Sequence, residues 1–361
     1  MPPPTRASVT RLLLPLAAGV IILAGVKQAA GILNPLLLAL FIVLVLIPML
    51  RWLRDRGLPG WLAVTAVASF VLLVGVVGVS YTVVTAKEIS DKLPEYKDQL
   101  AERQETVEVW LEKQGVDVAA LKEDNNLDGN EALQFAVDFA LGLATTLGST
   151  LLVGVILVYL LVESAGYSKR FHRAIGEQAP FHRALDDFAR DLGKFMTLRA
   201  WLGLFAAIFD VILLSVLGVD FAVFWGVVSF VLSFIPNVGF IISLVPPMVL
   251  AFIEFGVVRS LVVLGGYIAI NSGIDYVIAP RVLGRGLNLS PLVTFIAVVF
   301  WAWILGAPGA FLALPLTLAI KKLVLEQFEE TRWIAAVIGT DDGSSPPTVG
   351  PGVEAQAEAS G

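Results

Sequence analysis

Residues 234–247, FIPNVGFIISLVPP, lie in the middle of a long apolar region and decide how this chain folds. The stretch holds three prolines, and Pro236 is followed closely by an asparagine and a glycine. Proline removes a backbone donor, and its ring clashes with the preceding turn of a helix. Inside a membrane such a break is tolerated only where the freed backbone groups are buried in protein or line a wet cavity. We therefore predict two half-helices separated by a first break at residues 236–239.

The composition of the whole chain is that of a membrane protein. Of its 361 residues, 57% are hydrophobic and only 16% are charged, whereas a soluble chain carries roughly 25% charged residues. Apolar runs of about 18 residues or more recur, and each is long enough to cross a hydrocarbon core of ~30 Å. We expect an all-α polytopic membrane protein with about eight transmembrane segments. Two of these segments, both in the C-terminal half, are expected to be broken or re-entrant.

Several classes of protein are excluded. The chain has no cysteine, which rules out disulfides, thiolate metal sites and cysteine nucleophiles. Its two histidines, His172 and His182, lie in a polar connector, where we expect them to be solvated. No basic patch alternates with aromatic residues, so nucleic acid is not an expected partner. The motifs GxxxxGK and HExxH do not occur, and we predict neither an enzyme nor a cofactor nor a metal site.

Alternating apolar and polar stretches divide the chain into six parts. In order, they are a basic arm with three membrane spans (1–86), an extracytoplasmic amphipathic helical insert (87–142), a fourth span (143–162), a cytoplasmic basic connector (163–197), a C-terminal transport core (198–338) and a tail with the composition of disorder (339–361). The three spans of the first part are expected at residues 12–26, 32–50 and 61–86.

Basic residues predict how these parts are oriented. Short loops rich in lysine and arginine stay in the cytoplasm. One such loop, RWLRDRGLPG, follows the second span, and the connector at residues 163–197 is another. An even number of spans separates the connector from the basic N-terminal arm, so both lie on the same side. We expect a multi-pass protein of the inner (cytoplasmic) membrane, with both termini in the cytoplasm and the insert outside.

The insert contains one apolar stripe on an acidic helix. The apolar positions recur in steps of four and three, as on a single helix face, and Arg103 interrupts them; they are Ile89, Leu93, Tyr96, Leu100, Val107 and Trp110. Because anionic lipid repels acidic charge, we do not expect this helix to lie on the membrane surface. The stripe is expected to pack against a neighbouring helix or a second subunit.

A second interruption occurs in the last apolar segment. There the sequence GAPG covers residues 306–309, and Pro315 follows. Two segments interrupted by glycine and proline are typical of a transporter core, in which the ends of half-helices line the pathway. The positions at the two breaks that are expected to line the pathway are Pro236, Gly239, Pro246, Gly306, Pro308 and Gly309.

Polar residues inside the apolar segments are further candidates for the pathway. Placing an ionisable group at the bilayer centre costs roughly 2.5–3.5 kcal/mol on insertion scales, so such a group calls for a structural or functional explanation. Asp210 lies about half-way along its segment, and Asn271, Ser272 and Asp275 share one helical face. Such a face coordinates a cation, relays a proton or binds a hydroxylated solute; alternatively, it only joins helices through hydrogen bonds. Together with Asn237 at the first break, these residues form the predicted substrate-binding set.

Three motifs in the C-terminal half follow one another: SFIPNVGFIISLVPP, then APRVLGRGLNLSPLVTFIAVVFW, then GAPGAFLALPLTLAIKKLV. Together they resemble the autoinducer-2 exporter family of bacterial and archaeal membrane proteins. The matching positions are Pro236, Gly239 and Pro246 in the first motif, Pro280, Gly284, Leu287, Leu289 and Pro291 in the second, and Gly306, Gly309, Ala313 and Pro315 in the third. The N-terminal spans and the long insert also fit, so the resemblance covers roughly residues 10–335.

The resemblance implies a secondary transporter that assembles as a homo-oligomer, in this family a pentamer. Its implied cargo is a small polar solute such as a signalling molecule of the autoinducer-2 type or, alternatively, sodium or lithium exchanged for protons. The mouth of the pathway would include Pro280, Arg281, Gly284 and Arg285, whose arginines hold an anionic group or anchor the loop. A further alternative, from another class, is a non-transporting membrane scaffold. The expected partners are the lipid bilayer, other copies of the chain, and the small solute or monovalent cation.

Overall fold

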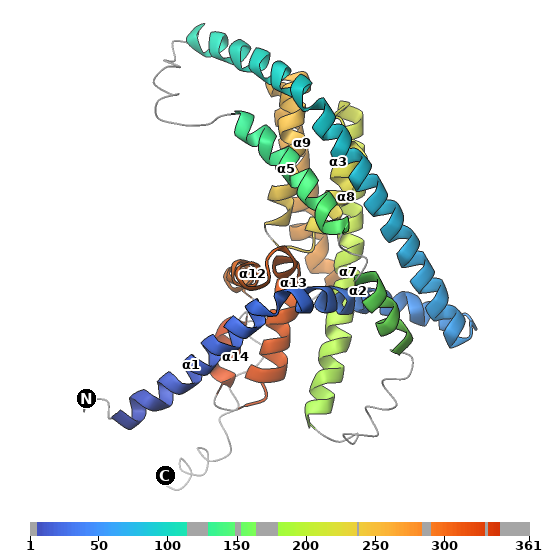
Figure 1. Ribbon diagram of the computed structural model, residues 1–361, viewed down its shortest axis with the longest axis vertical. Helices are drawn as coiled ribbons and strands as arrows, with labels where there is room; N and C mark the ends of the chain where they lie inside the picture. Colours follow the sequence, from blue (N-terminus) through green and yellow to red (C-terminus); the bar gives the residue numbers. More distant parts are fainter. Residues whose placement is uncertain are drawn as a thin grey trace, which may run out of the picture.

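The described part of the chain is almost entirely helical (Figure 1). The computed structural model describes residues 6–113, 129–148, 153–163, 180–236, 238–283, 290–328 and 331–339, and no strand occurs within these ranges. This confirms the predicted all-α class. Five of the described helices are long and apolar enough to cross a membrane, and several other apolar helices are shorter.

Fifteen helical elements follow one another along the described ranges. In chain order they are α1 (Arg6–Gln28), α2 (Ala30–Asp55), α3 (Gly60–Lys113), α5 (Gly129–Gly148), the helix Val153–Glu163, α7 (Pro180–Leu217), α8 (Ala222–Leu232), α9 (Gly239–Phe255), α10 (Val257–Ser272), the π-helix η1 (Gly273–Ile278), α11 (Ala279–Leu283), α12 (Pro291–Leu305), α13 (Ala307–Ile320), the π-helix η2 (Lys321–Leu325) and α14 (Arg332–Ile338).

α1 and α2 follow one another end to end, with only Ala29 between them, and the chain bends there without reversing (Figure 1). The sequence predicts two successive spans in this region, at residues 12–26 and 32–50. The intervening stretch KQAAG is rich in good helix formers, and its glycine has no left-handed conformation. Helical structure therefore continues through it almost without interruption.

Two helices are much longer than a membrane span. α3 joins the third predicted span to the insert in one helix of 54 residues, and α7 joins the end of the basic connector to the following span in 38 residues. At 1.5 Å per residue these helices are roughly 80 Å and 57 Å long, compared with a hydrocarbon core of ~30 Å. Both therefore extend well beyond the membrane, and α3 passes through Pro94 without ending.

Both predicted breaks are present. α8 ends at Leu232 and α9 begins at Gly239, whereas Gly306 alone separates α12 from α13. α12 and α13 pack along each other, and their 15 and 14 residues correspond to roughly 22 Å and 21 Å. Neither reaches across a hydrocarbon core of ~30 Å alone, although α13 and η2 together, Ala307–Leu325, have the length of a span.

Close backbone contacts explain why glycine occupies both breaks. A Cβ atom on Gly239 would lie 1.9 Å from the carbonyl oxygen of Leu232, and one on Gly309 would lie 1.9 Å from that of Trp301. Such distances are far inside van der Waals contact, so a larger residue requires the backbone to move. Gly306 has φ 73°, in the left-handed region that glycine enters without a steric penalty.

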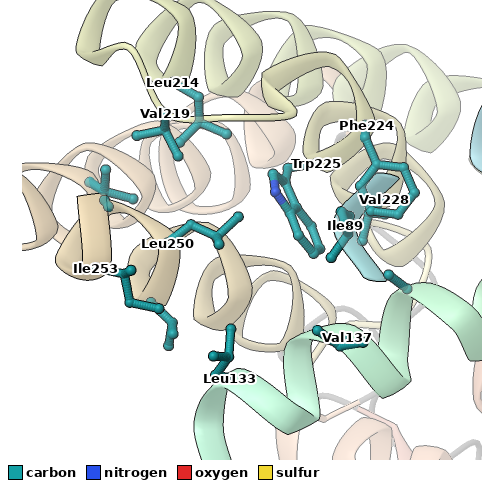
Figure 2. Packing of buried hydrophobic residues seen from close by; sticks show 14 of the residues in the cluster. Ile89, Leu133, Val137, Leu214, Val219, Phe224, Trp225, Val228, Leu250 and Ile253 are labelled. Atoms are coloured by element: carbon teal, nitrogen blue, oxygen red, sulfur yellow. The ribbon is translucent and has the colours of Figure 1, made fainter. Parts of the chain in front are cut away.

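The largest core cluster lies where the insert packs on the helix bundle. It combines residues of α3, α5, α7, α8, α9 and α10. Figure 2 shows Ile89 of α3 and Val137 of α5 in the same cluster as Trp225 of α8 and Leu250 of α9. The insert is thus fixed to the helices that carry the first break by buried apolar contacts, which are the main favourable contribution to folding.

The apolar stripe of the insert packs within its own chain, as the neighbouring-helix alternative predicts. Its buried members are Ile89, Tyr96 and Leu100, with Leu93 packed beside them. The side chains of Val107 and Trp110 lie outside the described part of the structure.

Arg103, which interrupts the stripe, contacts the end of α9. Its Nε donates to the carbonyl oxygen of Ile253 and its Nη2 to that of Glu254, each at 3.3 Å. The last carbonyls of a helix have no partner within the helix, and a cation there also complements the helix dipole. Arg103 therefore stabilises the contact between α3 and the C-terminus of α9.

Aromatic packing joins the two breaks to α2. Phe234, just before the first break, packs against Phe41 of α2 and Phe311 of α13, with ring centroids 5.5 Å and 5.1 Å apart. Ile235, just before the first break, and Val238, within it, pack on the cluster formed by α12 and α13. The two breaks are therefore joined to each other and to α2 through packed side chains.

Candidate functional site

α7 carries a face of small and polar residues toward α8 and α10. Arg199, Gly203, Ala206 and Asp210 follow at steps of four, three and four, which places them on one side of the helix. The first three of these line a cavity together with residues of α8 and α10. Phe205, on the opposite side, is half exposed, as expected for a side chain that faces lipid.

Asp210 is completely buried. Its side chain has 0% exposure, and its Oδ2 accepts a hydrogen bond from the Ser229 hydroxyl of α8 at 2.6 Å. The side chain of Asn271 on α10 lies beside the same carboxylate, while its Nδ2 donates to the carbonyl oxygen of Tyr267 at 3.0 Å. Three helices thus meet at one intramembrane carboxylate.

Arg199 and Asp275 form an ion pair at the other end of this face. Nη1 of Arg199 donates to Oδ1 of Asp275 at 2.5 Å, and both side chains are partly buried. Nε of Arg199 donates to the carbonyl oxygen of Ser233 at 2.8 Å, immediately after the end of α8. Asp275 lies in η1, and π-helical turns of this kind occur frequently at functional sites.

A small cavity connects these two polar groups. Its volume is about 10 Å³, and its lining includes Arg199, Ser229, Ser233, Asn271 and Asp275. That is close to the least space in which a single water molecule fits. We call the set Arg199, Asp210, Ser229, Asn271 and Asp275 the polar seam; in this conformation it is closed around room for about one water molecule.

The structure brings some of the predicted substrate-binding residues together and leaves others apart. Asn271 and Asp275 line the same cavity, and Asp210 adjoins it through Ser229. Ser272 is only partly buried and is not part of the lining. Asn237 lies outside the described residues.

The residues predicted at the breaks and at the mouth are more dispersed. Ile235 and Phe240, which flank the first break, line the cavity, whereas the second break approaches it only through its packing on Ile235. Pro246 is buried within α9, and Pro308 lies in the first turn of α13. Pro280 and Arg281 are exposed on α11, and Gly284 and Arg285 lie outside the described residues.

A second polar cluster, called the outer cluster after the predicted orientation, lies where α3 meets the C-terminus of α9. Asp220 accepts from Lys92 Nζ at 2.7 Å and from the Tyr96 hydroxyl at 2.9 Å. Its backbone N–H donates to Glu254 at 3.4 Å. These groups and Arg103 line an open pocket of about 420 Å³, which lies beyond the predicted span at residues 61–86.

The environment of this cluster shifts the pKa values of several of its side chains. Burial raises the pKa of Glu254 to about 7, and the nearby charge of Asp220 acts in the same direction. The hydrogen bond to Asp220 raises the pKa of Lys92, and burial raises the pKa of Tyr96. With a pKa of about 7, Glu254 changes its charge around neutral pH.

Sequence reasoning missed Arg199 and Ser229. Arg199 directly follows the basic connector and resembles one more cytoplasmic charge, and Ser229 is a small residue in an apolar run. A test for polar residues on the same face of one helix would have linked Arg199 to Asp210, since they lie about three turns apart. No local signal identifies Ser229, because only the packing of α8 against α7 brings it to Asp210.

Comparisons with known proteins agree with this architecture. The family model described as AI-2E family transporter matches residues 16–328. The chain is similar to the AI-2 transport protein TqsA of Escherichia coli, at 30% identity over 88% of this chain and 92% of that protein. It is also similar to a putative transport protein of Haemophilus influenzae, at 31% identity over 91% and 96%. A sodium-lithium/proton antiporter of Halobacillus andaensis is 25% identical over 80% and 87%.

Proposed function

Because this chain belongs to the AI-2E family of transporters, we propose that it is a secondary transporter whose cargo passes along the polar seam. Membership of the family makes it a multi-pass membrane transporter and confirms the resemblance seen in the motifs of the sequence. It favours transport over the scaffold alternative. The two helix breaks, joined by the packing of Phe234, Phe41 and Phe311, supply the half-helix ends on which such a pathway is built.

A monovalent cation exchanged for protons is the cargo that the geometry supports best. The observation that carries this proposal is Asp210, a completely buried carboxylate beside a cavity of about 10 Å³. A carboxylate inside the membrane is costly and marks an ion or proton pathway. The space beside it suits a proton or a nearly dehydrated ion and is too small for an organic solute.

In this proposal, the contacts of Arg199 hold the polar seam closed on its cytoplasmic side. Arg199 joins α7 to Asp275 of η1 and to the carbonyl oxygen of Ser233 next to the first break. Opening the seam on this side requires both contacts to separate, so movement of the first break is coupled to loss of the ion pair. In this proposal the first break is the hinge and Arg199 is the residue that positions it.

Export of a small polar solute of the autoinducer-2 type is the second candidate. It is favoured by the similarity to the AI-2 transport protein TqsA, which extends over 88% of this chain. Such a solute has several times the volume of a water molecule, so the seam must widen to admit it. The ion pair between Arg199 and Asp275 then has to open further than it would for an ion.

We also propose the orientation and assembly that the sequence indicates. Both termini face the cytoplasm, and the insert lies outside, because the basic connector follows an even number of spans. The subunits form a homo-oligomer, which the resemblance implies to be a pentamer. Exposed apolar side chains such as Val216 and Trp303 are compatible with lipid and with neighbouring subunits alike.

The experiment that tests the proposed cargo uses the purified full chain in liposomes that enclose a pH-sensitive dye. Sodium, lithium or potassium is added outside, and proton movement is compared among the wild type, Asp210→Asn and Asp275→Asn. We expect sodium- or lithium-driven proton movement in the wild type and background levels in Asp210→Asn, since the neutral amide carries no charge to exchange. Asp98→Asn, an exposed change in the insert, is the matched control and should behave as the wild type does.

A dye that stays silent in the wild type, with the protein shown to be folded, rejects cation/proton antiport. Uptake of a furanone-type solute into the same liposomes then tests the second candidate.

A further inference from the structure

Three fully buried polar atoms lie without hydrogen-bond partners on the helices of the polar seam. They are Oδ1 of Asp210, the hydroxyl of Tyr267 and Nε1 of Trp225, and each of these side chains has 0% exposure. Buried polar groups are nearly always paired, so each exception calls for an explanation such as a bound water or ion. Two of these atoms are oxygens on α7 and α10, which pack against each other, and they point to a bound species between these helices.

The two oxygens belong to one site. Tyr267 and Asn271 are one turn apart on α10, and the Asn271 side chain lies beside Asp210. Ser229, whose hydroxyl donates to Asp210, lines the same cavity as Asn271, so the face of α10 that carries Asn271 and Tyr267 is turned toward Asp210. Ser229 holds the other carboxylate oxygen, Oδ2, which leaves Oδ1 free to face a guest.

This site is distinct from the cavity at the cytoplasmic end of the seam. The cavity is lined by Ser229 and Asn271 but includes neither Asp210 nor Tyr267. α10 runs from Val257, on the side of the insert, toward η1, so Tyr267 lies one turn further out than Asn271. A cation held by Asp210 and Tyr267 therefore lies next to the cavity, one turn of α10 further from η1 than Asn271.

The chemistry of the unpaired Asp210 and Tyr267 oxygens indicates which kind of ligand they bind. A carboxylate oxygen and a hydroxyl oxygen are ligands for a hard cation, whereas the indole N–H of Trp225 only donates and is not a ligand. One carboxylate balances one positive charge. Within the described ranges no group of three His, Cys, Asp or Glu residues is placed to hold a metal ion, which argues against a divalent cation.

We propose that Oδ1 of Asp210 and the hydroxyl oxygen of Tyr267 are two ligands of a buried site for a monovalent cation of the size of sodium or lithium. This inference rests on the proposed function and names the atoms that select its cargo. A proton competes for the same carboxylate oxygen, so binding of the cation releases a proton. The other titratable groups that face the seam, Arg199 and Asp275, are paired with each other and leave Asp210 as the group that exchanges.

The test is equilibrium binding to the full chain in detergent, separate from any transport assay. Isothermal titration calorimetry with sodium chloride or lithium chloride, at constant ionic strength set with choline chloride, is compared for the wild type and Tyr267→Phe. This variant keeps the buried ring and removes only the hydroxyl oxygen. We expect the dissociation constant for sodium to rise at least about tenfold, because a partner of a charged group is lost. Asp210→Asn should abolish binding.

Tyr276→Phe is the matched control, since Tyr276 lies on η1 with a side chain that is 74% exposed. It should bind sodium as the wild type does. Binding by Tyr267→Phe that equals that of the wild type overturns the proposal, and so does the absence of any sodium-specific heat in a folded wild type. If the liposome assay still reports cation-driven proton movement in that case, the proposed function stands and only this ligand set is wrong.

Discussion

At the scale of single residues, the seam shows how a membrane protein keeps charged groups inside hydrocarbon. Arg199 and Asp275 neutralise each other, and Arg199 also donates to the carbonyl oxygen of Ser233. Within the described ranges Asp210 has no basic partner, and its carboxylate relies on the Ser229 hydroxyl. A buried charge without an opposite partner is unfavourable, so Asp210 is the position where a cation or a proton gains most by binding.

The glycines at the breaks give a prediction at the same scale. Gly309→Ala should lower the free energy of unfolding by about 3 kcal/mol, because its Cβ would lie 1.9 Å from the Trp301 carbonyl oxygen and the backbone must shift. Gly75→Ala is the control, since nothing lies within 4 Å of the added atom; it should gain roughly 0.5–1 kcal/mol from helix propensity. Thermal unfolding in detergent measures both, and equal stabilities would contradict the close packing at the second break.

At the scale of elements, the insert is held to the bundle by an apolar stripe and a polar cluster. Ile89, Tyr96 and Leu100 of α3 are buried in the core. Arg103 closes the C-terminus of α9, and Lys92 pairs with Asp220 between α7 and α8. One helix thus contacts both the junction between α7 and α8 and the junction between α9 and α10.

Docking of the insert should depend on pH through Glu254. Its pKa is raised from 4.5 to about 7 when it is packed against the insert, so the docked state keeps a proton that an undocked glutamate has lost. The docked state of the insert is therefore most stable at low pH. The contribution of Glu254 to this stability falls as pH rises from about 4.5 to about 7. The charged groups around it are Asp220, Lys92, Glu95 and Arg103.

Hydrogen exchange of the amides at residues 89–103, followed from pH 5 to pH 8, measures this effect. Protection in the wild type should decrease relative to Glu254→Gln as pH rises, since the amide never loses a proton. Glu105→Gln, an exposed change on the same helix, should follow the wild type. Parallel curves for the wild type and Glu254→Gln would show that Glu254 does not control docking.

At the scale of the whole molecule, function depends on which side of the membrane each part occupies. α3 and α7 both extend beyond any hydrocarbon core, α3 with the insert and α7 with the end of the basic connector. In the proposed orientation these extensions point to opposite sides. The outer cluster around Asp220 and the ion pair of Arg199 then lie toward the outer and the cytoplasmic ends of the seam, respectively.

Because the chain has no cysteine, its orientation can be tested with single substitutions. Asp98→Cys on α3 and Lys194→Cys on α7 are both exposed positions. A membrane-impermeant maleimide added to intact cells or spheroplasts should label Asp98→Cys fully and Lys194→Cys only after the membrane is permeabilised. The reverse pattern would invert the proposed topology and exchange the two ends of the seam.

Much of the fold was predictable from the sequence, because helix class and helix breaks depend on residues close together in the chain. Hydrophobic runs predict the helices, and the prolines and glycines near Pro236 and Gly306 predict the breaks. The spacing of Asn271 and Asp275 predicts a shared face, and they do line one cavity. The end-to-end arrangement of α1 and α2 was not foreseen, since the hydropathy of two runs does not reveal whether the chain reverses between them.

The sequence alone determined the helical membrane class, the two breaks and the apolar stripe of the insert, all of which depend on periodicity and local backbone chemistry, and its motifs carried the resemblance to the transporter family. Only the tertiary structure decided that Arg199 pairs with Asp275, that Ser229 holds Asp210 and that the Tyr267 hydroxyl is left unpaired. The physical reason is that these contacts join residues on different helices. They depend on how the helices approach and rotate against one another, which no local pattern in the chain specifies.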